Sequence, residues 1–182
     1  MSRIGKKAIT IPAGVTVKFD NDKCTVTGPL GTLTKRVEPK LTYKIDGEVL
    51  TVENNNTEAM YNAYHGLYRQ IINNMVIGVT QGFKKSLTVN GVGFKVTKQG
   101  NKLVMNLGLS HPVEVMEEDG VKLSNNNNEI IVEGISKERV GAMASKIRAI
   151  RPVEPYHGYG IRYTDETVSL KEGKSSGKGG KK

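Results

Sequence analysis

The chain of 182 residues contains no tryptophan, a single cysteine and only 5% aromatic residues. One cysteine can form neither an intramolecular disulfide nor a cysteine-based zinc site, so the lone Cys24 fits a reducing compartment. No stretch approaches the roughly 18 consecutive apolar residues of a membrane-spanning helix, and the N-terminus lacks the apolar segment of a signal peptide. We therefore expect a soluble intracellular protein with a small aliphatic core and no membrane partner.

Side chains that could support catalysis or bind a metal are also scarce. The three histidines, His65, His111 and His157, lie far apart, and none begins a zinc-ligand pattern. We expect His65 to be a partly exposed residue of a helix and Cys24 to be a small core residue. The acidic run Glu117–Asp119 leads into a glycine, which is typical of a hairpin turn. The sequence thus predicts no enzymatic activity, no cofactor and no small-molecule substrate.

Positive charge is in excess and is distributed unevenly. The chain has 27 basic and 18 acidic residues, which gives a net charge of +9. Residues 1–82 carry 10 basic and 7 acidic side chains (+3), whereas residues 83–182 carry 17 and 11 (+6). This balance favours anionic partners, of which nucleic acid is the commonest. The second half is the better candidate for the binding face.

Short segments with apolar and polar residues in alternation predict strands, and the 21 glycines supply turns between them. The segments are Ile9–Ile11, Val15–Phe19, Cys24–Thr27, Leu33–Val37, Leu41–Ile45, Val49–Val52, Leu87–Val89, Phe94–Thr97, Leu103–Leu107, Val113–Met116, Val121–Leu123 and Ile130–Val132.

Two further segments have a helical period. Between Glu58 and Asn73, an apolar residue recurs every fourth position, which predicts a helix with this stripe facing the core. The stripe is Ala59, Ala63, Leu67 and Ile71, and Asn56 or Thr57 is placed to cap the helix. The second helix is predicted at Lys137–Ile150 with Ser136 as its N-cap. Its apolar stripe is Val140, Met143, Ala144 and Ile147.

The two halves repeat one plan at a constant offset of 80 residues. Gly28 corresponds to Gly108, Val52-Glu53 to Val132-Glu133, and Glu58 to Glu138. One offset that matches strands, turns and a helix in order indicates internal duplication. We therefore predict an α+β fold of two tandem modules, each with small antiparallel sheets packed on one helix. The expected divisions are a basic arm at 1–8, modules at 9–82 and 83–170, and a disordered basic tail at 171–182.

The stretch Arg148–Tyr163 is the strongest candidate for a binding surface. It reads RAIRPVEPYHGYGIRY, in which two prolines end the second helix and three tyrosines, a histidine and an arginine follow. Such rings can stack on bases, and arginine matches phosphate oxygens. The tyrosines could equally cover a small core beneath a proline- and glycine-rich loop. Spacing alone leaves both interpretations open.

A second candidate is the glycine pair of Gly91-Val92-Gly93-Phe94, which lies near Lys84, Lys85 and Lys95. Glycines beside an aromatic residue would let the backbone approach a phosphate backbone. A bulged hairpin with no binding role fits the same pattern.

Three motifs carry a resemblance to a known family. The segments MSRIGKKAITIP, NGVGFKV and EPYHGYGIRY, the last followed by a lysine-rich end, resemble the bacterial L-six family of large-subunit ribosomal proteins. The likeness covers essentially the whole chain. It implies two α+β modules, with rRNA bound chiefly by the C-terminal half, near the base of the factor-binding stalk and the sarcin–ricin region.

The C-terminal motif matches at Glu154, Pro155, Tyr156, Gly158, Gly160 and Ile161, and Arg162-Tyr163 continues it. The family usually has lysine where this chain has His157 and Tyr159. For these two residues we expect stacking or hydrogen bonding in place of two cations. Val153 also stands where proline or serine is usual.

The residues and the resemblance together predict a structural constituent of the large ribosomal subunit, with large-subunit rRNA and neighbouring ribosomal proteins as partners. The alternative is a basic tandem module that binds proteins without specific RNA recognition. Contacts to phosphates and sugars would read RNA shape, and the arm and tail would become ordered only on the RNA. The predicted rRNA-binding residues are Arg3, Lys6, Lys84, Lys85, Gly91, Gly93, Phe94, Lys95, Arg148, Arg151, Pro155, Tyr156, His157, Gly158, Tyr159, Gly160, Arg162, Tyr163, Lys171 and Lys174.

Overall fold

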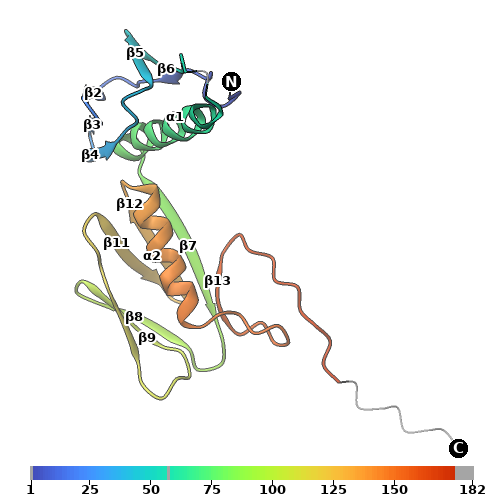
Figure 1. Cartoon of the computed structure of the whole chain (residues 1–182). Helices are drawn as coiled ribbons and strands as arrows, with labels where there is room; N and C mark the ends of the chain where they lie inside the picture. The colour runs from blue at the N-terminus through green and yellow to red at the C-terminus, as the bar shows by residue number, and fades with distance from the viewer. Residues whose placement is uncertain (1, 57, 175–182) are drawn as a thin grey trace, which may run out of the picture. The chain divides into compact units, whose positions relative to one another are not determined.

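The computed structural model of the chain describes residues 2–56 and 58–174, and Figure 1 shows its strands and helices. The chain forms two compact units. The first contains the described residues up to Phe83 together with Gly134–Arg139, and the second contains Lys84–Glu133 and the chain from Val140 onward. Most of the basic tail expected at 171–182 lies outside the described residues.

The first half of the chain builds two three-stranded antiparallel sheets and a long helix, α1 (Ala59–Thr80). One sheet has the order β2-β3-β4 and the other the order β1-β6-β5. Their strands are β1 (Ile9–Thr10), β2 (Thr16–Asp20), β3 (Lys23–Gly28), β4 (Gly31–Arg36), β5 (Thr42–Asp46) and β6 (Val49–Glu53). Inward-facing residues such as Val26 and Leu50 pack with Ile72 and Val79 of α1 in one aliphatic core.

The second half contains a three-stranded sheet of order β10-β9-β8 and a four-stranded sheet of order β11-β12-β7-β13. Its first strands are β7 (Phe83–Asn90), β8 (Lys95–Gln99), β9 (Lys102–Asn106) and β10 (Val113–Met116). The others are β11 (Val121–Asn126), β12 (Glu129–Gly134) and β13 (Gly160–Tyr163), and the helix is α2 (Lys137–Ile150). Leu87 on β7, Ile130 on β12 and Ile147 on α2 are fully buried.

The predicted duplication is visible strand by strand. Sheet β2-β3-β4 has its counterpart in β8-β9-β10, and β1-β6-β5 has its counterpart in β7-β12-β11. The offset of 80 residues carries β5 (Thr42–Asp46) onto β11 (Val121–Asn126) and β6 (Val49–Glu53) onto β12 (Glu129–Gly134). The second copy differs by one added strand, β13, which pairs with β7. The sequence interpretation missed this strand because it treated Gly160–Tyr163 as part of a loop.

Helix α2 agrees with its prediction. It spans Lys137–Ile150, and all four residues of its predicted stripe are buried. The Ser136 hydroxyl accepts a hydrogen bond of 3.5 Å from the amide of Arg139, as an N-cap residue does.

The predicted core stripe of α1 is wrong. Ala59, Ala63 and Leu67 are exposed and Ile71 is half-buried, whereas the buried face is Tyr61, His65, Ile72, Met75, Val76, Gly78 and Val79. In its first turns the inner face carries Tyr61 and His65, with Tyr64 and Tyr68 partly buried beside them, so a search for aliphatic residues selected the wrong side. The helix also continues to Thr80, and Glu58 occupies its N-cap position without a side-chain bond. Asn56 donates to the carbonyl of Lys40 instead, and Thr57 lies outside the described residues.

His65 is buried, contrary to the expectation of a partly exposed residue, and it anchors the N-terminal segment. Its Nε2 donates a hydrogen bond of 2.7 Å to the Val52 carbonyl, which fixes the tautomer because a carbonyl can only accept. The ring lies against Gly5, where an added Cβ would come within 2.5 Å of it. Arg69 donates to the carbonyls of Lys7 and Ala8. Residues 2–8 therefore lie along α1, held by the contacts of His65 and Arg69.

Candidate nucleic-acid interface

The two copies of the fold diverge most where α2 ends. Helix α1 has 22 residues and α2 has 14. At the offset of 80 residues, the last ten residues of α1 correspond to 151–160, where Pro152 and Pro155 forbid a helix. The second copy therefore replaces the end of a helix by an exposed loop, which we call the 152–159 loop. It then adds β13.

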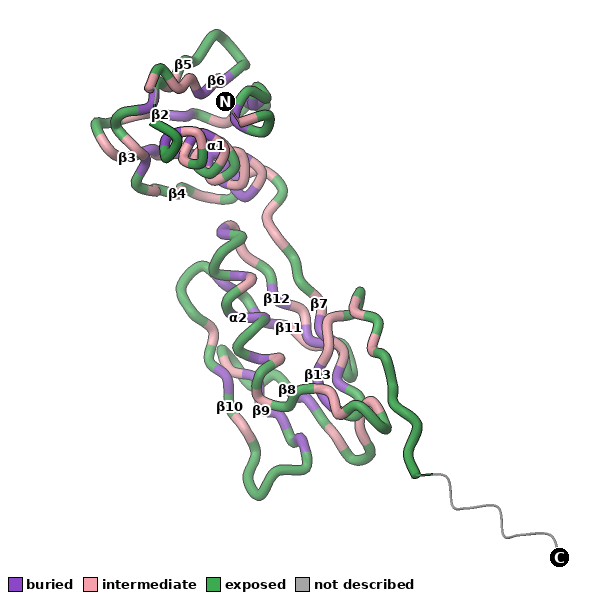
Figure 2. Tube along the Cα trace, turned by 45° about the vertical axis from the view of Figure 1, so that its right-hand side comes forward, coloured by how far each residue is buried: buried purple, intermediate pink, exposed green. Residues whose placement is uncertain are grey.

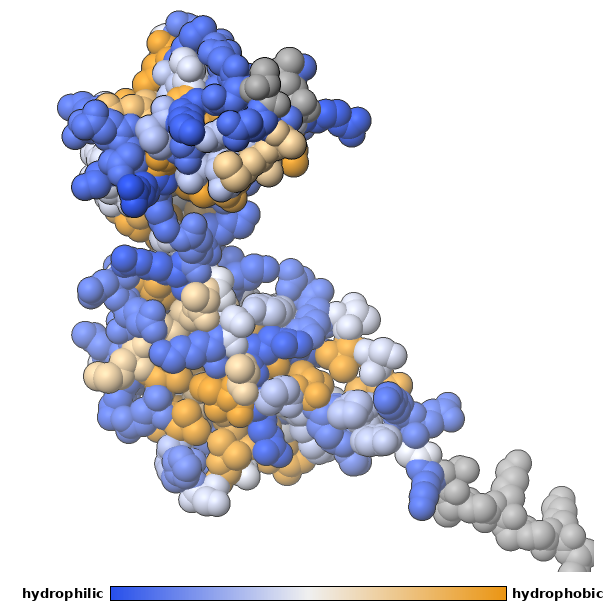
Figure 3. Space-filling model, in the orientation of Figure 1, coloured by the Kyte–Doolittle hydropathy of each residue, from blue (hydrophilic) through white to orange (hydrophobic). Residues whose placement is uncertain are grey.

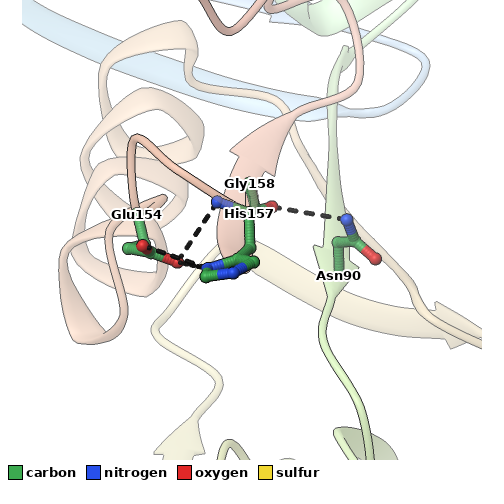
Figure 4. A network of polar contacts seen from close by, with 4 residues as sticks. All are labelled: Asn90, Glu154, His157 and Gly158. Carbon is green, nitrogen blue, oxygen red and sulfur yellow. Dashed lines mark hydrogen bonds and ion pairs between the residues drawn. The ribbon is translucent and has the colours of Figure 1, made fainter. Parts of the chain in front are cut away.

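Backbone hydrogen bonds hold the 152–159 loop in one conformation. The Glu154 amide donates to the Tyr159 carbonyl (2.9 Å), and the Gly158 amide donates to the Glu154 carbonyl (3.1 Å). At the base of the loop, the Ile161 amide donates to the Arg151 carbonyl (2.8 Å). The Asn90 side chain on β7 donates to the Gly158 carbonyl (3.3 Å), as Figure 4 shows. Such a loop can meet a partner without a large cost in ordering.

Gly160 is the position at which this loop returns to the sheet. It has a φ of +140°, and an added Cβ would lie 2.6 Å from the Pro152 carbonyl oxygen. Any side chain at Gly160 would push the chain away from Pro152 and Val153 at the start of the loop. Glycine at this position is therefore required by the fold and does not itself indicate RNA contact.

Two aromatic rings at the tip of the loop lie face to face. The rings of His157 and Tyr159 are 5.5 Å apart at their centroids and 15° from parallel. The Glu154 carboxylate points at the His157 ring, with 3.0 Å between Oε2 and Nδ1 (Figure 4). Tyr156 beside them is 51% exposed. Tyr156, His157 and Tyr159 are thus available to a partner and cover no core.

Tyr163, by contrast, is half-buried and is occupied within the protein. The ammonium of Lys85 lies 5.3 Å from its ring centroid, and the guanidinium of Arg148 lies 5.7 Å from it. Two of the three tyrosines, Tyr156 and Tyr159, therefore face solvent, whereas Tyr163 packs within the protein. Its neighbour Arg162 is also half-buried on β13, and its Nε has no hydrogen-bond partner among the described residues.

Arg148, predicted to bind RNA, forms a two-pronged ion pair with Glu166. Its Nε lies 3.0 Å from Oε2 and its Nη2 lies 2.6 Å from Oε1. These hydrogen bonds hold the pKa of the Glu166 carboxyl below its usual value and raise the pKa of Arg148. Glu166 also accepts from the Tyr163 amide. Arg148 thus joins α2 to the chain that follows β13.

The predicted lysines differ in how far they are engaged. Lys84 pairs with Glu133 at 3.4 Å and Lys85 with Asp165 at 3.8 Å. Lys95, Arg151, Lys171 and Lys174 are exposed, and no ion pair of theirs is found within residues 2–56 and 58–174. Exposed ion pairs contribute little to stability and are easily exchanged for a phosphate. The amide of Lys171 donates to the Pro155 carbonyl (2.8 Å), which keeps this residue beside the loop.

The glycine pair at the turn between β7 and β8 has a structural explanation. The ring of Phe94 covers Gly91, where an added Cβ would come within 2.5 Å of ring atoms, and it also lies against Gly108. Gly93 has a φ of +76°. These glycines serve a tight turn with a half-buried aromatic ring. The turn is not the bulged hairpin of the sequence interpretation, because β7 and β8 belong to different sheets, and RNA contact by these glycines stays a prediction. The remaining predicted residues, Arg3 and Lys6, belong to the first unit and are exposed.

The sequence interpretation overlooked three residues that position this surface. Glu154 had been noted only as part of a motif, although its spacing of three residues from His157 could have indicated the contact. Asn90 and Glu166 reach the loop and Arg148 across the fold, and no local pattern reveals such contacts. Within the described residues, no group of acidic, histidine or cysteine side chains is placed to hold a metal ion. Neither described helix is both long and apolar enough to cross a membrane.

Comparison with known proteins decides the family. The family model described as Ribosomal protein L6 matches the chain twice, over residues 11–82 and 90–164. This chain belongs to the ribosomal protein L6 family. The two matches fall on the two copies and confirm the tandem α+β duplication. Membership also makes the chain a non-enzymatic component of the ribosome, as the sequence had indicated.

Relatives of this L6 chain extend over its full length. A protein of Exiguobacterium sibiricum named large ribosomal subunit protein uL6 is 52% identical over 176 residues, which cover 96% of this chain and 99% of the relative. Proteins of the same name from Shouchella clausii and Caldicellulosiruptor saccharolyticus are 50% and 49% identical, and cover 96% and 100% of this chain. The matched part covers 99% and 100% of these two relatives, respectively.

Proposed function

We propose that this L6 protein is a structural constituent of the large ribosomal subunit in the cytoplasm and binds rRNA mainly through the second half of its chain. One observation carries the proposal. The second copy alone replaces the end of a helix by the 152–159 loop, which brings Tyr156, His157 and Tyr159 to the surface. The resemblance further implies a location near the base of the factor-binding stalk and the sarcin–ricin region, beside other ribosomal proteins.

The chemistry of the loop suits folded RNA. Arg151, Lys95, Lys171 and Lys174 supply exposed cations for phosphates, and their contacts would release counterions and make affinity depend on salt. Tyr156 and the stack of His157 and Tyr159 offer faces to a sugar or an unpaired base. Since the loop is held by its own backbone bonds, it would recognise the shape of an RNA surface rather than wrap around a strand.

The proposal is tested by equilibrium binding of the full-length protein to a large-subunit rRNA fragment and to an unrelated structured RNA of equal length, each at two salt concentrations. We expect tighter binding to the rRNA fragment, with the preference retained at the higher salt. Equal binding to both RNAs, lost together as salt rises, would leave only a non-specific basic surface. The protein-binding alternative would then be favoured.

A pair of variants assigns the preference to the loop. Replacing Tyr156 and His157 by alanine removes exposed rings without touching a core residue, and we expect the preference for the rRNA fragment to fall. Phe19→Leu serves as a control outside the loop. Phe19 is a half-buried aromatic residue of the first unit, and its ring stacks on that of Tyr43. An equal loss in both variants would remove the loop from the interface.

A further inference from the structure

The exposed side of α1 has the spacing of a helix-packing seam. Met60, Ala63, Leu67 and Gln70 are all exposed and follow one another at intervals of three, four and three residues. Met60 is 50% exposed and Leu67 is 51% exposed, and Figure 2 shows exposed positions alternating with buried ones around α1. This is the a/d spacing by which one helix packs along another. We call these four residues the α1 seam.

The α1 seam is uncharged. Helix α1 contains no acidic residue and only one arginine, Arg69. That arginine is engaged, because its Nε and Nη2 each donate a hydrogen bond of 3.0 Å to the carbonyls of Lys7 and Ala8. Affinity for RNA comes from cations that neutralise phosphates. A seam of methionine, alanine, leucine and glutamine offers none, and an apolar protein surface suits it better.

One flank of the seam is basic. The folded segment 2–8 lies along α1, and an added Cβ on Gly66 would lie 2.8 Å from the Ser2 hydroxyl. Gly66 is one turn from both Ala63 and Gln70, so this segment borders the seam. Its Arg3, Lys6 and Lys7 are exposed. A partner that covers the seam would therefore meet positive charge on one side and favour acidic residues there.

We propose that the α1 seam docks an amphipathic helix of a neighbouring ribosomal protein, with apolar residues facing Met60, Ala63 and Leu67 and acidic residues facing the segment 2–8. Hydrophobic and hydrophilic residues both reach the visible face of the molecule in Figure 3, so the feature that sets the seam apart is its lack of charged side chains. The proposal goes beyond rRNA binding, because it concerns the first unit and requires no contact with RNA.

Methionine oxidation tests whether the seam is covered. In the free full-length protein, peroxide should oxidise Met60 readily, while the buried Met75, Met105 and Met143 resist. In purified large subunits that contain the protein, we expect oxidation of Met60 to fall to the rate of Met75. Unchanged oxidation of Met60 in the subunit would overturn the proposal.

Crosslinking identifies what covers the seam. A photoreactive phenylalanine analogue placed at Ala63 in the full chain should, in purified subunits, crosslink to a helical peptide of another protein with acidic residues on one side. A crosslink to rRNA, or to a peptide that is not helical, would contradict the proposal. Sedimentation of the free protein should show a monomer. A dimer abolished by Leu67→Glu would make a second copy of this chain the occupant instead.

A matched pair of variants measures what the contact contributes. Leu67→Glu places a charge in the seam, and Ile45→Glu places one on β5 of the same unit, where Ile45 is 41% exposed. In direct competition with wild type for incorporation into large subunits, we expect Leu67→Glu to lose about ten-fold, the effect of one desolvated apolar anchor, and Ile45→Glu to compete equally. Equal loss by both variants would remove the special role of the seam. Binding of Leu67→Glu to the isolated rRNA fragment should match wild type, which separates this proposal from the rRNA interface.

Discussion

Glycine is required at position 160 because the backbone conformation and the close approach of Pro152 at the base of the loop leave no room for a side chain. Replacing it by alanine would force a Cβ to within 2.6 Å of the Pro152 carbonyl oxygen at a φ of +140°. We expect Gly160→Ala to lower the free energy of unfolding by about 2 kcal/mol or more, measured by urea denaturation. Gly141 within α2 has no atom within 4 Å of an added Cβ, so Gly141→Ala should instead stabilise by about 0.5 kcal/mol. Similar results for both would refute the crowding at Gly160.

Arg148 and Arg151 lie only three positions apart in the chain and have different surroundings. Arg148 is bound by Glu166, whereas Arg151 is exposed. We expect Arg151→Ala to weaken binding to the rRNA fragment and to flatten its salt dependence by about one unit of slope, with the stability unchanged. Arg148→Ala should chiefly lower stability. If Arg148→Ala changed the salt slope of rRNA binding and left stability unaltered, the ion pair with Glu166 would not be what Arg148 contributes.

At the scale of elements, the pair of Arg148 and Glu166 ties α2 to the chain beyond β13. The lowered pKa of Glu166 means that this pair stabilises the folded protein above the carboxyl's ordinary pKa of about 4.3, and that the gain is lost as pH falls through the lower folded value. Glu166→Gln should therefore cost about 1 kcal/mol at pH 7, since the pair is partly exposed. The difference from wild type should begin to shrink as pH falls below about 4.3 and should vanish only once the pH is below the lowered pKa of Glu166. A difference that persisted there would point to packing rather than charge.

The two helices show what can be inferred from local sequence. Helix α2 buries the aliphatic stripe that its period predicts, so its bounds, cap and core face were all correct. Helix α1 buries Tyr61 and His65 in its first turns, and its aliphatic residues at Ala63 and Leu67 face outward. The period of apolar residues identifies a helix, but which side of the helix faces the core depends on how its residues pack against the sheets. For the tyrosines of the C-terminal motif, the sequence could not separate the exposed Tyr156 and Tyr159 from the half-buried Tyr163. That distinction depends on strand β13, which the sequence pattern did not predict.

For the whole molecule, the excess charge of the second half should be reflected in RNA binding. Lys95→Gln with Arg151→Gln removes two exposed cations from the second unit, and Lys18→Gln with Lys23→Gln removes two from the first. We expect the first pair to reduce the salt slope of rRNA binding by about two, and the second pair to have little effect. Since each double variant loses the same net charge, equal effects would mean that charge alone governs binding.

The fully buried thiol of Cys24 can report transient opening of the first unit, because only opening exposes it to a reagent. Burial raises the pKa of this thiol to about 12, and a thiol reagent attacks only the thiolate. In native buffer, modification should therefore wait for the unit to open, and its rate should give the opening free energy of that unit alone. Mass spectrometry of a labelling time course can follow this in the free protein and in the ribosome. Immediate labelling of the folded chain would contradict the burial of Cys24. Since the chain has one cysteine, a slower rate of Cys24 labelling in the ribosome would measure directly how much assembly stabilises the first unit against opening.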